Sequence, residues 1–574
     1  MASYRKPTVW INVTTSAAWT RPPVGIVRVE RALAAHLQKA MGTEECRLCV
    51  WQDDRFVEWV PPSTAPSSDQ LEQAVDLMLP RSASFDLARP FVMRALRRFA
   101  ADSSGPKRQD QVQLAIPTRG SAGLHPQRGD FVISVGLDWD NRYTELFHDL
   151  SRREGLRFIT CCYDLIPVLF PQYCVGEVAQ RFTEYFAQLS WGSEAVLCIS
   201  EQTRRDYVQL CSELGAPARK TVVIPLGDNI PAQGDNIGMQ VDALARKPFI
   251  LFVSTIERRK NHEVLYRAYH LLARRGLAHK LPPLVFVGMP GWGVSELLKD
   301  IELDPLTQGL IVQLNHVSDS ELNHLYRHAS FCVFPSLYEG WGLPVGEALA
   351  MGKAVVASAQ GSLPEVGGDL VRYTQPWDVY AWADVLQELI ENPDRVREME
   401  ARVRKHYQPR QWTETAKIVI SLIEELSRTE PPVITWLPGY DLRTHVGVHF
   451  GPSLQATGVA GMLAFGPHWT MPPGTYEVSV WGKLDAGTKE TVTFDVTSDR
   501  GARTHHEEQF RLIGEPDTSP LANLRFTLDR EAHAFEIRCE VESRSTLRLD
   551  RIEIRNRAQA QSTATATELA AKAA

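Results

Sequence analysis

The chain has 574 residues, of which 44% are hydrophobic and 23% are charged, and its formal net charge at pH 7 is −7. This composition is typical of a globular protein and excludes a mostly disordered chain, a collagen-like fibre and a coiled coil. The negative charge argues against a protein whose whole surface attracts nucleic acid. The nine cysteines are odd in number and scattered, which argues against a disulfide framework and favours a reducing compartment.

The length predicts three or four domains, at about 100–200 residues each. No segment contains the roughly 18–20 consecutive apolar residues of a membrane-spanning helix. The first residues turn polar after a short apolar run, so no signal peptide is expected. We therefore expect a cytoplasmic protein.

The first domain is predicted over residues 1–240. Residues 8–13 are a short β-branched run typical of a buried strand, and residues 26–37 carry apolar residues at helical spacing after a loop that ends at Gly25. This strand, glycine loop and helix are the opening unit of an α/β fold. Short apolar runs predict four further strands, at residues 130–135, 158–162, 195–199 and 221–224.

An insertion is predicted in this domain at about residues 61–125, because its two ends are rich in Pro, Ser and other polar residues. Within it, residues 89–99 alternate large apolar side chains with arginines, and such a basic amphipathic helix can lie on an anionic membrane. A helix packed on the domain with a solvated basic face is the interpretation we prefer, because the stretch is only about three turns long.

The second domain is predicted over residues 241–429 and begins with a strand at residues 249–253. The later apolar runs are nearly continuous, as expected for parallel strands covered on both faces. Strands are predicted at residues 284–287, 310–314, 331–334 and 354–357, and helices at 261–275, 320–328 and 344–351. The first 429 residues therefore predict two doubly wound α/β domains that face a cleft.

The pattern changes at residues 430–432 (EPP), after which short segments alternate apolar and polar residues. This pattern predicts an antiparallel β-sandwich over residues 430–557, followed by a disordered tail at 558–574. Its strands are predicted at residues 476–481, 491–497, 524–528, 534–540 and 546–554. Its aromatic side chains can either stack on sugars, as in a carbohydrate-binding module, or form a core that packs on the catalytic unit or on another subunit; these residues are Trp469, Tyr476, Trp481 and Phe494.

Two acids mark the most informative stretch, residues 334–348 (FPSLYEGWGLPVGEA). A strand ends there, a glycine-rich loop follows, and a helix begins near Pro344, so free backbone N–H groups can hold a phosphate. Glu339 and Glu347 would repel that phosphate, and their expected use is to accept hydrogen bonds from hydroxyl groups. A sugar nucleotide has phosphates in its middle and hydroxyls at both ends, so it suits this arrangement.

This stretch resembles the E-x7-E element of the retaining family 4 glycosyltransferases, in the setting P-S-x-x-E-G-x-G-L-P-x-x-E-A. The resemblance covers roughly residues 9–425. Its other motifs are residues 25–29 (GIVRV), 163–167 (YDLIP), 254–261 (STIERRKN), 350–358 (AMGKAVVAS) and 363–366 (LPEV), together with Trp412.

The resemblance implies a GT-B fold, in which the C-terminal α/β domain holds a nucleotide sugar and the N-terminal domain faces the acceptor. It implies that Glu347 binds the ribose hydroxyls and that Glu339 contacts hydroxyls of the donor sugar. Arg259 and Lys260 would neutralise the departing diphosphate, which fits the charge that develops there. The resemblance implies further donor contacts from Gly25, from the backbone of Gly342 and Leu343, and from His316 and Val317 near the base.

Metal ligands are not expected, and the family members typically need no metal or other cofactor. Asp138 and Asp140 form a D-x-D pattern that binds metal in other glycosyltransferase folds, but here a loop with solvated acids is the preferred interpretation. Cys46 and Cys49 have no second ligand pair, so a zinc site is not predicted.

One position departs from the family pattern, because Tyr163 stands where a His usually precedes Asp164. A phenol with a pKa near about 10 is a poor base at neutral pH, which leaves the role of Tyr163 open. Asp164 could bind the acceptor or help remove its proton, and it could equally cap the loop before Pro167.

The predicted function is transfer of a hexose, with retention, from a nucleotide diphosphate sugar to a glycan or lipid-linked glycan in surface-polysaccharide or O-antigen synthesis. GDP-mannose is the first choice of donor by resemblance, with dTDP-rhamnose or a UDP-sugar as alternatives. Contact with the periphery of the inner membrane is possible, and no nucleic-acid partner is expected. Two other hypotheses stay open: a sugar-nucleotide epimerase or phosphorylase on the same architecture, and a glycan-binding protein with a decayed catalytic unit.

Overall fold

The computed structural model describes residues 6–19, 25–52, 55–61, 125–174, 178–217, 219–228, 237–429, 433–471, 473–514, 519–530 and 532–556. The predicted insertion is therefore represented by its two end residues alone. The predicted helix at 89–99 and the predicted tail at 558–574 lie outside the described residues.

The N-terminal domain is built on a seven-stranded sheet of order β3-β2-β1-β4-β5-β6-β7. Its neighbours pair in parallel, except for β3, which pairs antiparallel with β2 at the edge. The strands are β1 Val9–Asn12, β2 Cys46–Gln52, β3 Arg55–Glu58, β4 Phe131–Ser134, β5 Arg157–Cys162, β6 Ala195–Cys198 and β7 Lys220–Val223. Its main helices are α2 Gly25–Met41, α4 Phe147–Glu154, α6 Val178–Gly192 and α7 Glu201–Glu213, with short helices α1 Thr14–Ala17 and α5 Ile166–Leu169.

The predicted strands of this domain are confirmed, and their burial explains why the sequence revealed them. Every residue of β1, β4, β5 and β6 is buried, as expected for central parallel strands covered on both faces. The predicted helix at 26–37 is also confirmed, and α2 buries Val29, Leu33 and Leu37 at helical spacing.

The C-terminal α/β domain contains a six-stranded parallel sheet of order β10-β9-β8-β11-β12-β13. The strands are β8 Ile250–Val253, β9 Leu284–Val287, β10 Ile311–Leu314, β11 Phe331–Phe334, β12 Val355–Ala357 and β13 Arg372–Tyr373. The helices are α8 Met239–Ala245, α9 His262–Leu272, α10 Ser295–Leu303, α11 Asp319–His328, α12 Leu343–Ala350, α13 Leu363–Gly367, α14 Val379–Glu391 and α15 Pro393–His406. The chain reverses its direction of winding between β8 and β11, so their carboxyl ends flank a crevice of the kind that binds ligands.

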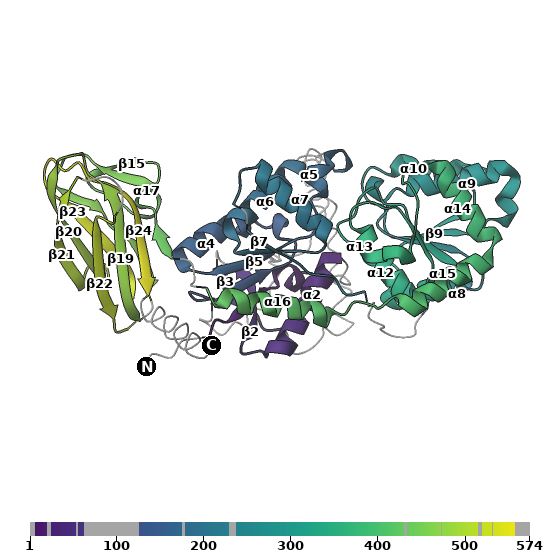
Figure 1. Cartoon of the computed structure of the whole chain (residues 1–574), viewed down its shortest axis with the longest axis horizontal. Coiled ribbons are helices and arrows are strands. Elements are labelled where there is room, and N and C mark those ends of the chain that lie inside the picture. Colours follow the sequence, from purple (N-terminus) through teal and green to yellow (C-terminus); the bar gives the residue numbers. More distant parts are fainter. Residues whose placement is uncertain are drawn as a thin grey trace, which may run out of the picture.

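The chain then returns to the N-terminal domain. Helix α16, Trp412–Ser427, packs on α2, and the two helices lie side by side in Figure 1. The buried Arg157 of β5 donates hydrogen bonds to the carbonyl of Leu426 at 2.8 Å and to the hydroxyl of Thr429 at 2.7 Å. These contacts tie the end of the α/β region to the first sheet.

The C-terminal part consists of two antiparallel sheets that enclose one hydrophobic core, which confirms the predicted sandwich. One sheet has the order β15-β16-β24-β19-β22, with β14 beside β24, and the other has the order β17-β23-β20-β21, with β18 beside β23. The strands are β14 Ile434–Trp436, β15 Gly447–Phe450, β16 Ser453–Ala456, β17 Gly461–Ala464, β18 Pro467–Met471, β19 Gly474–Lys483, β20 Lys489–Ser498, β21 Arg503–Ile513, β22 Ala522–Leu528, β23 Ala532–Val541 and β24 Arg548–Asn556.

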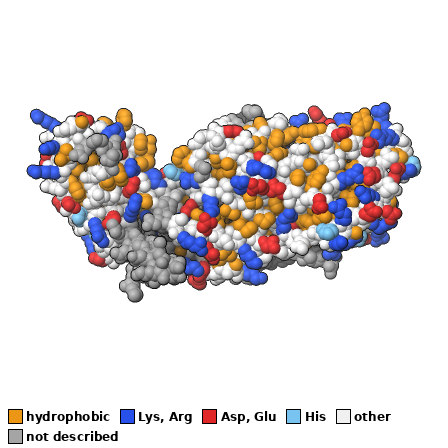
Figure 2. All heavy atoms as spheres, in the orientation of Figure 1, with side chains coloured by type: hydrophobic (Ala, Val, Ile, Leu, Met, Phe, Trp, Pro, Cys, Tyr) orange, Lys and Arg blue, Asp and Glu red, His pale blue; other side chains and the backbone are white. Residues whose placement is uncertain are grey.

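The sandwich lies against the N-terminal domain, on the side away from the C-terminal α/β domain (Figure 1). Arg152 of α4 donates to the carboxylate of Asp441 at 2.5 Å and to the carbonyl of Thr435 at 2.6 Å. In the space-filling view, the sandwich forms a separate lobe, and acidic and basic side chains alternate over the visible face of the α/β domains (Figure 2).

The four aromatic residues singled out in the sandwich divide between core and surface. Tyr476 and Phe494 are buried in the core, and Trp469 packs against it. Trp481 is half-buried, with the guanidinium of Arg551 lying 4.1 Å from its ring centroid. Three of the four rings therefore serve packing.

The prediction that Asp138 and Asp140 are solvated acids in a loop is wrong for Asp138. The two lie in a short 3-10 helix, Asp138–Asp140, and Asp138 is buried with one carboxylate oxygen accepting a hydrogen bond from Tyr143 at 2.6 Å. Aromatic residues around it exclude water, which the D-x-D spacing alone did not indicate. Asp140 is exposed, as predicted.

A second buried acid, Glu30 of α2, lies near Asp138. One of its oxygens accepts a hydrogen bond from the backbone N–H of Ser16 at 2.7 Å, and the other is buried without a partner among the described residues. Burial is the main cause that raises the pKa of Glu30 from 4.5 to about 7, and the charge of Asp138 adds to the effect.

We predict that Glu30→Gln stabilises the protein more at pH 8 than at pH 5. When folding raises the pKa of a carboxyl group, the protein loses stability as the pH rises from the unfolded pKa to the folded pKa of that group. For Glu30 this range runs from 4.5 to about 7. The neutral amide avoids that loss, so the gain in Tm over the native protein should be larger at pH 8 by at least about 2 °C. Thermal unfolding at both pH values measures it, with Glu213→Gln on the exposed end of α7 as control; an equal gain at both pH values contradicts the prediction.

Candidate functional site

The candidate site lies at the carboxyl ends of β8 and β11, which are neighbours in the C-terminal α/β sheet. The loop after β8 contains Arg259 and Lys260, and the loop after β11 contains Glu339. Because parallel neighbours end at the same edge, residues that are about 80 positions apart in the sequence meet here.

Glu339 is held by both predicted cations. Its Oε1 accepts a hydrogen bond from Lys260 Nζ at 2.7 Å, and its Oε2 accepts one from Arg259 at 2.9 Å. Burial opposes ionisation of Glu339, but the charges of Lys260 and Arg259 outweigh it and lower the pKa of the carboxyl to about 2. The structure therefore brings three of the predicted site residues together as one charged cluster.

Arg259 joins this cluster to the cleft. Its guanidinium also donates to the backbone carbonyl of Tyr338 at 2.7 Å and to Glu257 at 2.9 Å. These neighbouring carboxylates, Glu339 and Glu257, raise the pKa of Arg259 although burial lowers it. The cation is therefore fixed in position before any ligand arrives.

Glu347 lies apart from that cluster, on α12, and pairs with the other domain. Its Oε1 accepts a hydrogen bond from Arg28 of α2 at 2.9 Å, and its Oε2 accepts one from the hydroxyl of Tyr326 at 3.1 Å. The side chains of Arg28 and Glu347 are 14% and 6% exposed. Burial raises the pKa of Glu347, and the charge of Arg28 opposes that rise.

The predicted backbone donors lie at the start of α12. Gly342 has a φ of +104° as the residue that precedes the helix, and Leu343 is its first residue. Gly25 begins α2 with a φ of +49°, one helical turn before Arg28. Val317 is half-buried after β10, which is separated from β11 by two strands, but Asp319 two residues later lies 3.4 Å from Arg28.

The two α/β domains touch at Gly340, beside Glu339. A Cβ atom on Gly340 would lie 2.4 Å from the carbonyl oxygen of Tyr163 and 2.8 Å from Cβ of Asp164. The Thr203 hydroxyl of α7 is 3.3 Å from the carbonyl oxygens of both Tyr163 and Gly340. The absence of a side chain at Gly340 thus lets the donor-side loop reach the other domain.

A carboxylate adds a second contact between the domains. Glu365 of α13 accepts hydrogen bonds at 2.7 Å from the backbone N–H groups of Glu201 and Gln202, at the start of α7. An acid at the N-terminus of a helix is also favoured by the helix dipole. The sequence element LPEV therefore closes the cleft by capping a helix of the other domain.

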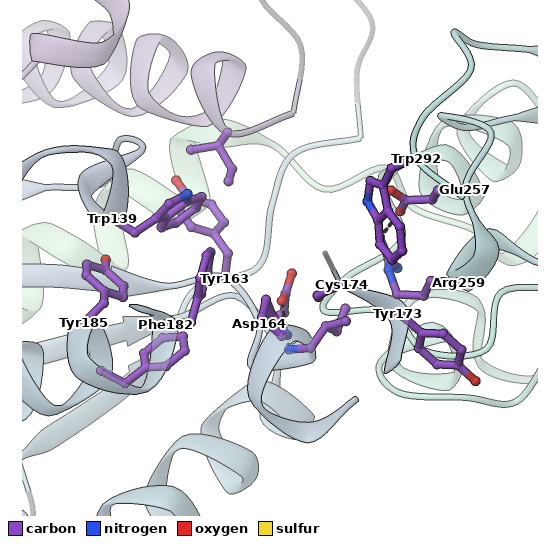
Figure 3. A pocket seen from close by; sticks show the side chains of 14 residues that line it. Trp139, Tyr163, Asp164, Tyr173, Cys174, Phe182, Tyr185, Glu257, Arg259 and Trp292 are labelled. Atoms are coloured by element: carbon purple, nitrogen blue, oxygen red, sulfur yellow. Dashed lines mark hydrogen bonds and ion pairs between the residues drawn. The ribbon is translucent and has the colours of Figure 1, made fainter. Parts of the chain in front are cut away.

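A pocket opens between these contacts, with a volume of about 200 Å³. Most of the labelled aromatic side chains of the N-terminal domain lie on one side of Asp164, and Tyr173 lies across from them with Glu257, Arg259 and Trp292 of the other domain (Figure 3). The aromatic residues labelled on the first side are Trp139, Tyr163, Phe182 and Tyr185. The pocket therefore offers flat apolar surfaces and charged groups to the same ligand.

Asp164 and Tyr163 differ in whether their polar groups remain available to a ligand in the pocket. The hydroxyl of Tyr163 donates to the carbonyl of Val135 at 2.5 Å inside the N-terminal domain. Asp164 accepts a hydrogen bond from the backbone N–H of Ile166 at 3.0 Å, as the capping interpretation predicts, and it also lines the pocket. Burial raises the pKa of Asp164, and the charge of Arg259 opposes that rise.

Sequence reasoning missed the partners that come from other elements. Arg28 lies within the glycine motif GIVRV, but nothing in that motif indicates that it reaches Glu347 in the other domain. Trp292 and Tyr326 lie in segments without a recognised motif, and only the fold brings them to the site. Among the described residues, no helix is long and apolar enough to cross a membrane, and no three His, Cys, Asp or Glu side chains form a metal-binding group.

Comparisons with known proteins show which proteins this chain is similar to. Residues 239–406 match the family model described as glycosyl transferases group 1. The O-antigen chain mannosyltransferase B of Escherichia coli is 32% identical over 274 residues, which cover 46% of this chain and 69% of that protein. The serotype-specific mannosyltransferase WbdA of Escherichia coli is 27% identical over 271 residues, but these cover only 32% of its length.

Solved structures are more distant. Sucrose-phosphate synthase from Thermosynechococcus elongatus is 20% identical, with a TM-score of 0.46, and the match covers 74% of this chain and 99% of that one. Anabaena Alr3699/HepE in complex with UDP is 14% identical, with a TM-score of 0.44, and the match covers 74% of this chain and 100% of that one.

We predict that Gly340→Ala separates the two α/β domains without unfolding either. Gly340 has no positive φ, so the substitution adds no backbone strain, but its Cβ would collide with a backbone carbonyl that cannot move alone. Small-angle scattering should report a larger radius of gyration. Gly238→Ala is the control, because its Cβ would meet only a side-chain oxygen, that of Glu321 at 2.8 Å, and no backbone atom; an unchanged radius for Gly340→Ala contradicts the assigned contact.

Proposed function

The chain belongs to the group 1 glycosyl transferases, and we propose that it transfers a hexose, with retention, from a nucleotide diphosphate sugar to a glycan acceptor. Its two doubly wound domains facing a cleft form the GT-B fold that the sequence predicts. The observation that carries the proposal is the cluster of Glu339, Arg259 and Lys260 at the carboxyl edge of the C-terminal sheet.

The donor is proposed to lie along that edge. Glu347 would accept hydrogen bonds from the ribose hydroxyls, because it is a buried carboxylate on a helix that starts beside the loop of Glu339. Glu339 would accept them from the sugar, and Val317 with His316 would lie near the base. The diphosphate between them would meet the N–H groups of Gly342 and Leu343 at the start of α12. Gly25 would let the loop of the N-terminal domain approach the diphosphate from the other side.

Departure of the nucleoside diphosphate is the step that these groups assist. The bond between C1 of the sugar and the β-phosphate oxygen breaks, and the bonding electrons stay on the phosphate. Arg259 and Lys260 are already fixed next to that charge, so they stabilise it without reorganising. Two cations and a helix start supply this stabilisation without a metal or other cofactor.

The acceptor hydroxyl is proposed to approach from the pocket and form the new bond to C1 on the same face. Its proton passes to an oxygen on that face, either of the departing phosphate or of Asp164. The aromatic walls of the pocket suit the apolar face of a sugar ring, and its volume of about 200 Å³ suits a single ring, since a cavity of about 150 Å³ already holds benzene.

GDP-mannose is the proposed donor and mannose the sugar transferred, because the relatives named above are mannosyltransferases. A dTDP-rhamnose or UDP-sugar donor is the alternative. The proposed acceptor is a glycan or lipid-linked glycan of O-antigen or another surface polysaccharide, in the cytoplasm and in contact with the inner membrane; the O-antigen chain mannosyltransferase named above supports the O-antigen part of this proposal. In that setting the sandwich would hold the N-terminal domain through Arg152 and Asp441, or bind the product glycan as a carbohydrate-binding module.

We predict that Lys260→Ala and Glu347→Gln each lower mannose transfer from GDP-mannose at least about 100-fold, as loss of one charge-stabilising group typically does. Purified protein is assayed with a mannose-terminated oligosaccharide in the presence of EDTA, and Glu321→Gln on the surface of α11 serves as control. Near-normal turnover of both variants contradicts the assigned site. Loss of native activity in EDTA alone contradicts the proposal that no metal is needed.

We predict that Trp292→Ala raises KM for the acceptor and leaves KM for the donor almost unchanged. Trp292 lines the pocket from the C-terminal α/β domain, across from Trp139, so its loss removes one stacking surface for the acceptor ring. A stacked ring contributes roughly 0.5–1.5 kcal/mol beyond its buried area, so a rise of about 2- to 13-fold is expected. Initial rates with each substrate varied in turn measure it, and a rise confined to the donor KM assigns the pocket to the donor instead.

A further inference from the structure

Arg28 is a residue of the N-terminal domain that contacts the proposed nucleotide site directly, through Glu347. It lies in the first turn of α2, and its guanidinium bridges two acids of the other domain, Glu347 at 2.9 Å and Asp319 at 3.4 Å. Its side chain is 14% exposed. Such a buried cation needs partners at all times, because an unpaired buried charge is costly.

The contact raises a conflict with the proposed role of Glu347. Both of its oxygens are occupied, one by Arg28 and one by Tyr326. A ribose hydroxyl that binds Glu347 must therefore share or displace the bond from Arg28. The displaced guanidinium would then need a new anion within reach of its long side chain.

Building on the proposed function, we propose that Arg28 is a ligand of the donor diphosphate, held on Glu347 and Asp319 until the donor binds. When the nucleotide enters, its ribose hydroxyls donate to Glu347 and its phosphate oxygens accept from Arg28. Each acid and each cation keeps a partner through this exchange. The exchange breaks and forms only hydrogen bonds and ion pairs.

The position and chemistry of Arg28 fit a diphosphate. It lies one helical turn after Gly25, which has a φ of +49°, and no atom of the described residues lies within 4 Å of a Cβ built on Gly25, so these residues leave room for a ligand there. The planar guanidinium forms paired hydrogen bonds with phosphate oxygens more readily than an ammonium group does. Asp319, at the start of α11, keeps a second acid beside Arg28 in either state.

The same exchange distinguishes a nucleoside diphosphate from a nucleoside. A nucleoside offers hydroxyls to Glu347 but no anion to Arg28, so its binding would leave the cation without an equivalent partner. A diphosphate supplies that partner. The selectivity for diphosphate over nucleoside should therefore depend on Arg28.

The test compares GDP with guanosine on the full-length protein. Isothermal titration measures both affinities for the native protein, Arg28→Ala and Arg28→Lys, after a thermal-shift panel of GDP, UDP, dTDP and ADP has identified the base that binds; the matching nucleoside replaces guanosine if that base differs. Arg28→Ala should weaken binding of the diphosphate at least about 10-fold and leave nucleoside binding unchanged or tighter. Arg28→Lys should recover part of the loss.

Arg31→Ala is the matched control, because Arg31 lies one turn further along α2 and donates only to the backbone carbonyls of Ser16 and Trp19 among the bonds described for it. If Arg28→Ala binds the diphosphate as tightly as the native protein or more tightly, Arg28 only competes for Glu347 and the proposal is overturned. Equal weakening of both ligands assigns Arg28 to domain closure alone and overturns it too. If no diphosphate of the panel binds the native protein, the proposed function fails first.

Discussion

The cleft depends on one constraint, which is that the two buried carboxylates of the proposed donor site, Glu339 and Glu347, need cationic partners. Glu339 satisfies it with Lys260 and Arg259, and their charges lower its pKa to about 2 despite burial. Glu347 satisfies it with Arg28, but incompletely, since burial still raises its pKa. This difference has a functional meaning. The first acid stays charged and ready to accept hydrogen bonds, whereas the second depends on a residue of the other domain and therefore on how the domains are arranged.

Several of the contacts that bring the domains together have a backbone group on at least one side. Gly340 approaches the Tyr163 carbonyl where a Cβ would collide, and Glu365 binds two N–H groups at the start of α7. Backbone groups do not change rotamer, so these contacts define one closed geometry. Charged side chains add to these contacts, and one of them, Arg28, bonds directly to Glu347 of the nucleotide site proposed above.

The sequence predicted the elements whose apolar residues follow a regular pattern, and it missed the features that depend on a tertiary partner. The fully buried strands β4, β5, β9 and β11 were predicted because a parallel strand covered on both faces has a continuous apolar pattern. Strand β21 was missed, because it pairs only with β20 at an edge and most of its side chains are polar and exposed. Asp138 was predicted as solvated, since nothing in a D-x-D spacing reveals that aromatic residues will enclose one acid. The motif acids were found from the resemblance, but their pairing with Arg28 across the domains follows only from the fold.

The pairing of acids with cations in the cleft bears on how the enzyme would bind its donor. In a site where each acid already holds a cation, a ligand gains little by adding another charge of either sign alone. A sugar nucleotide carries both kinds of group, hydroxyls that can donate to the acids and phosphates that can accept from the cations, and it can replace both sets of partners at once. A ligand with only one of them would leave a buried charge unpaired. The paired charges of the cleft thus already favour a molecule in which hydroxyls flank a diphosphate.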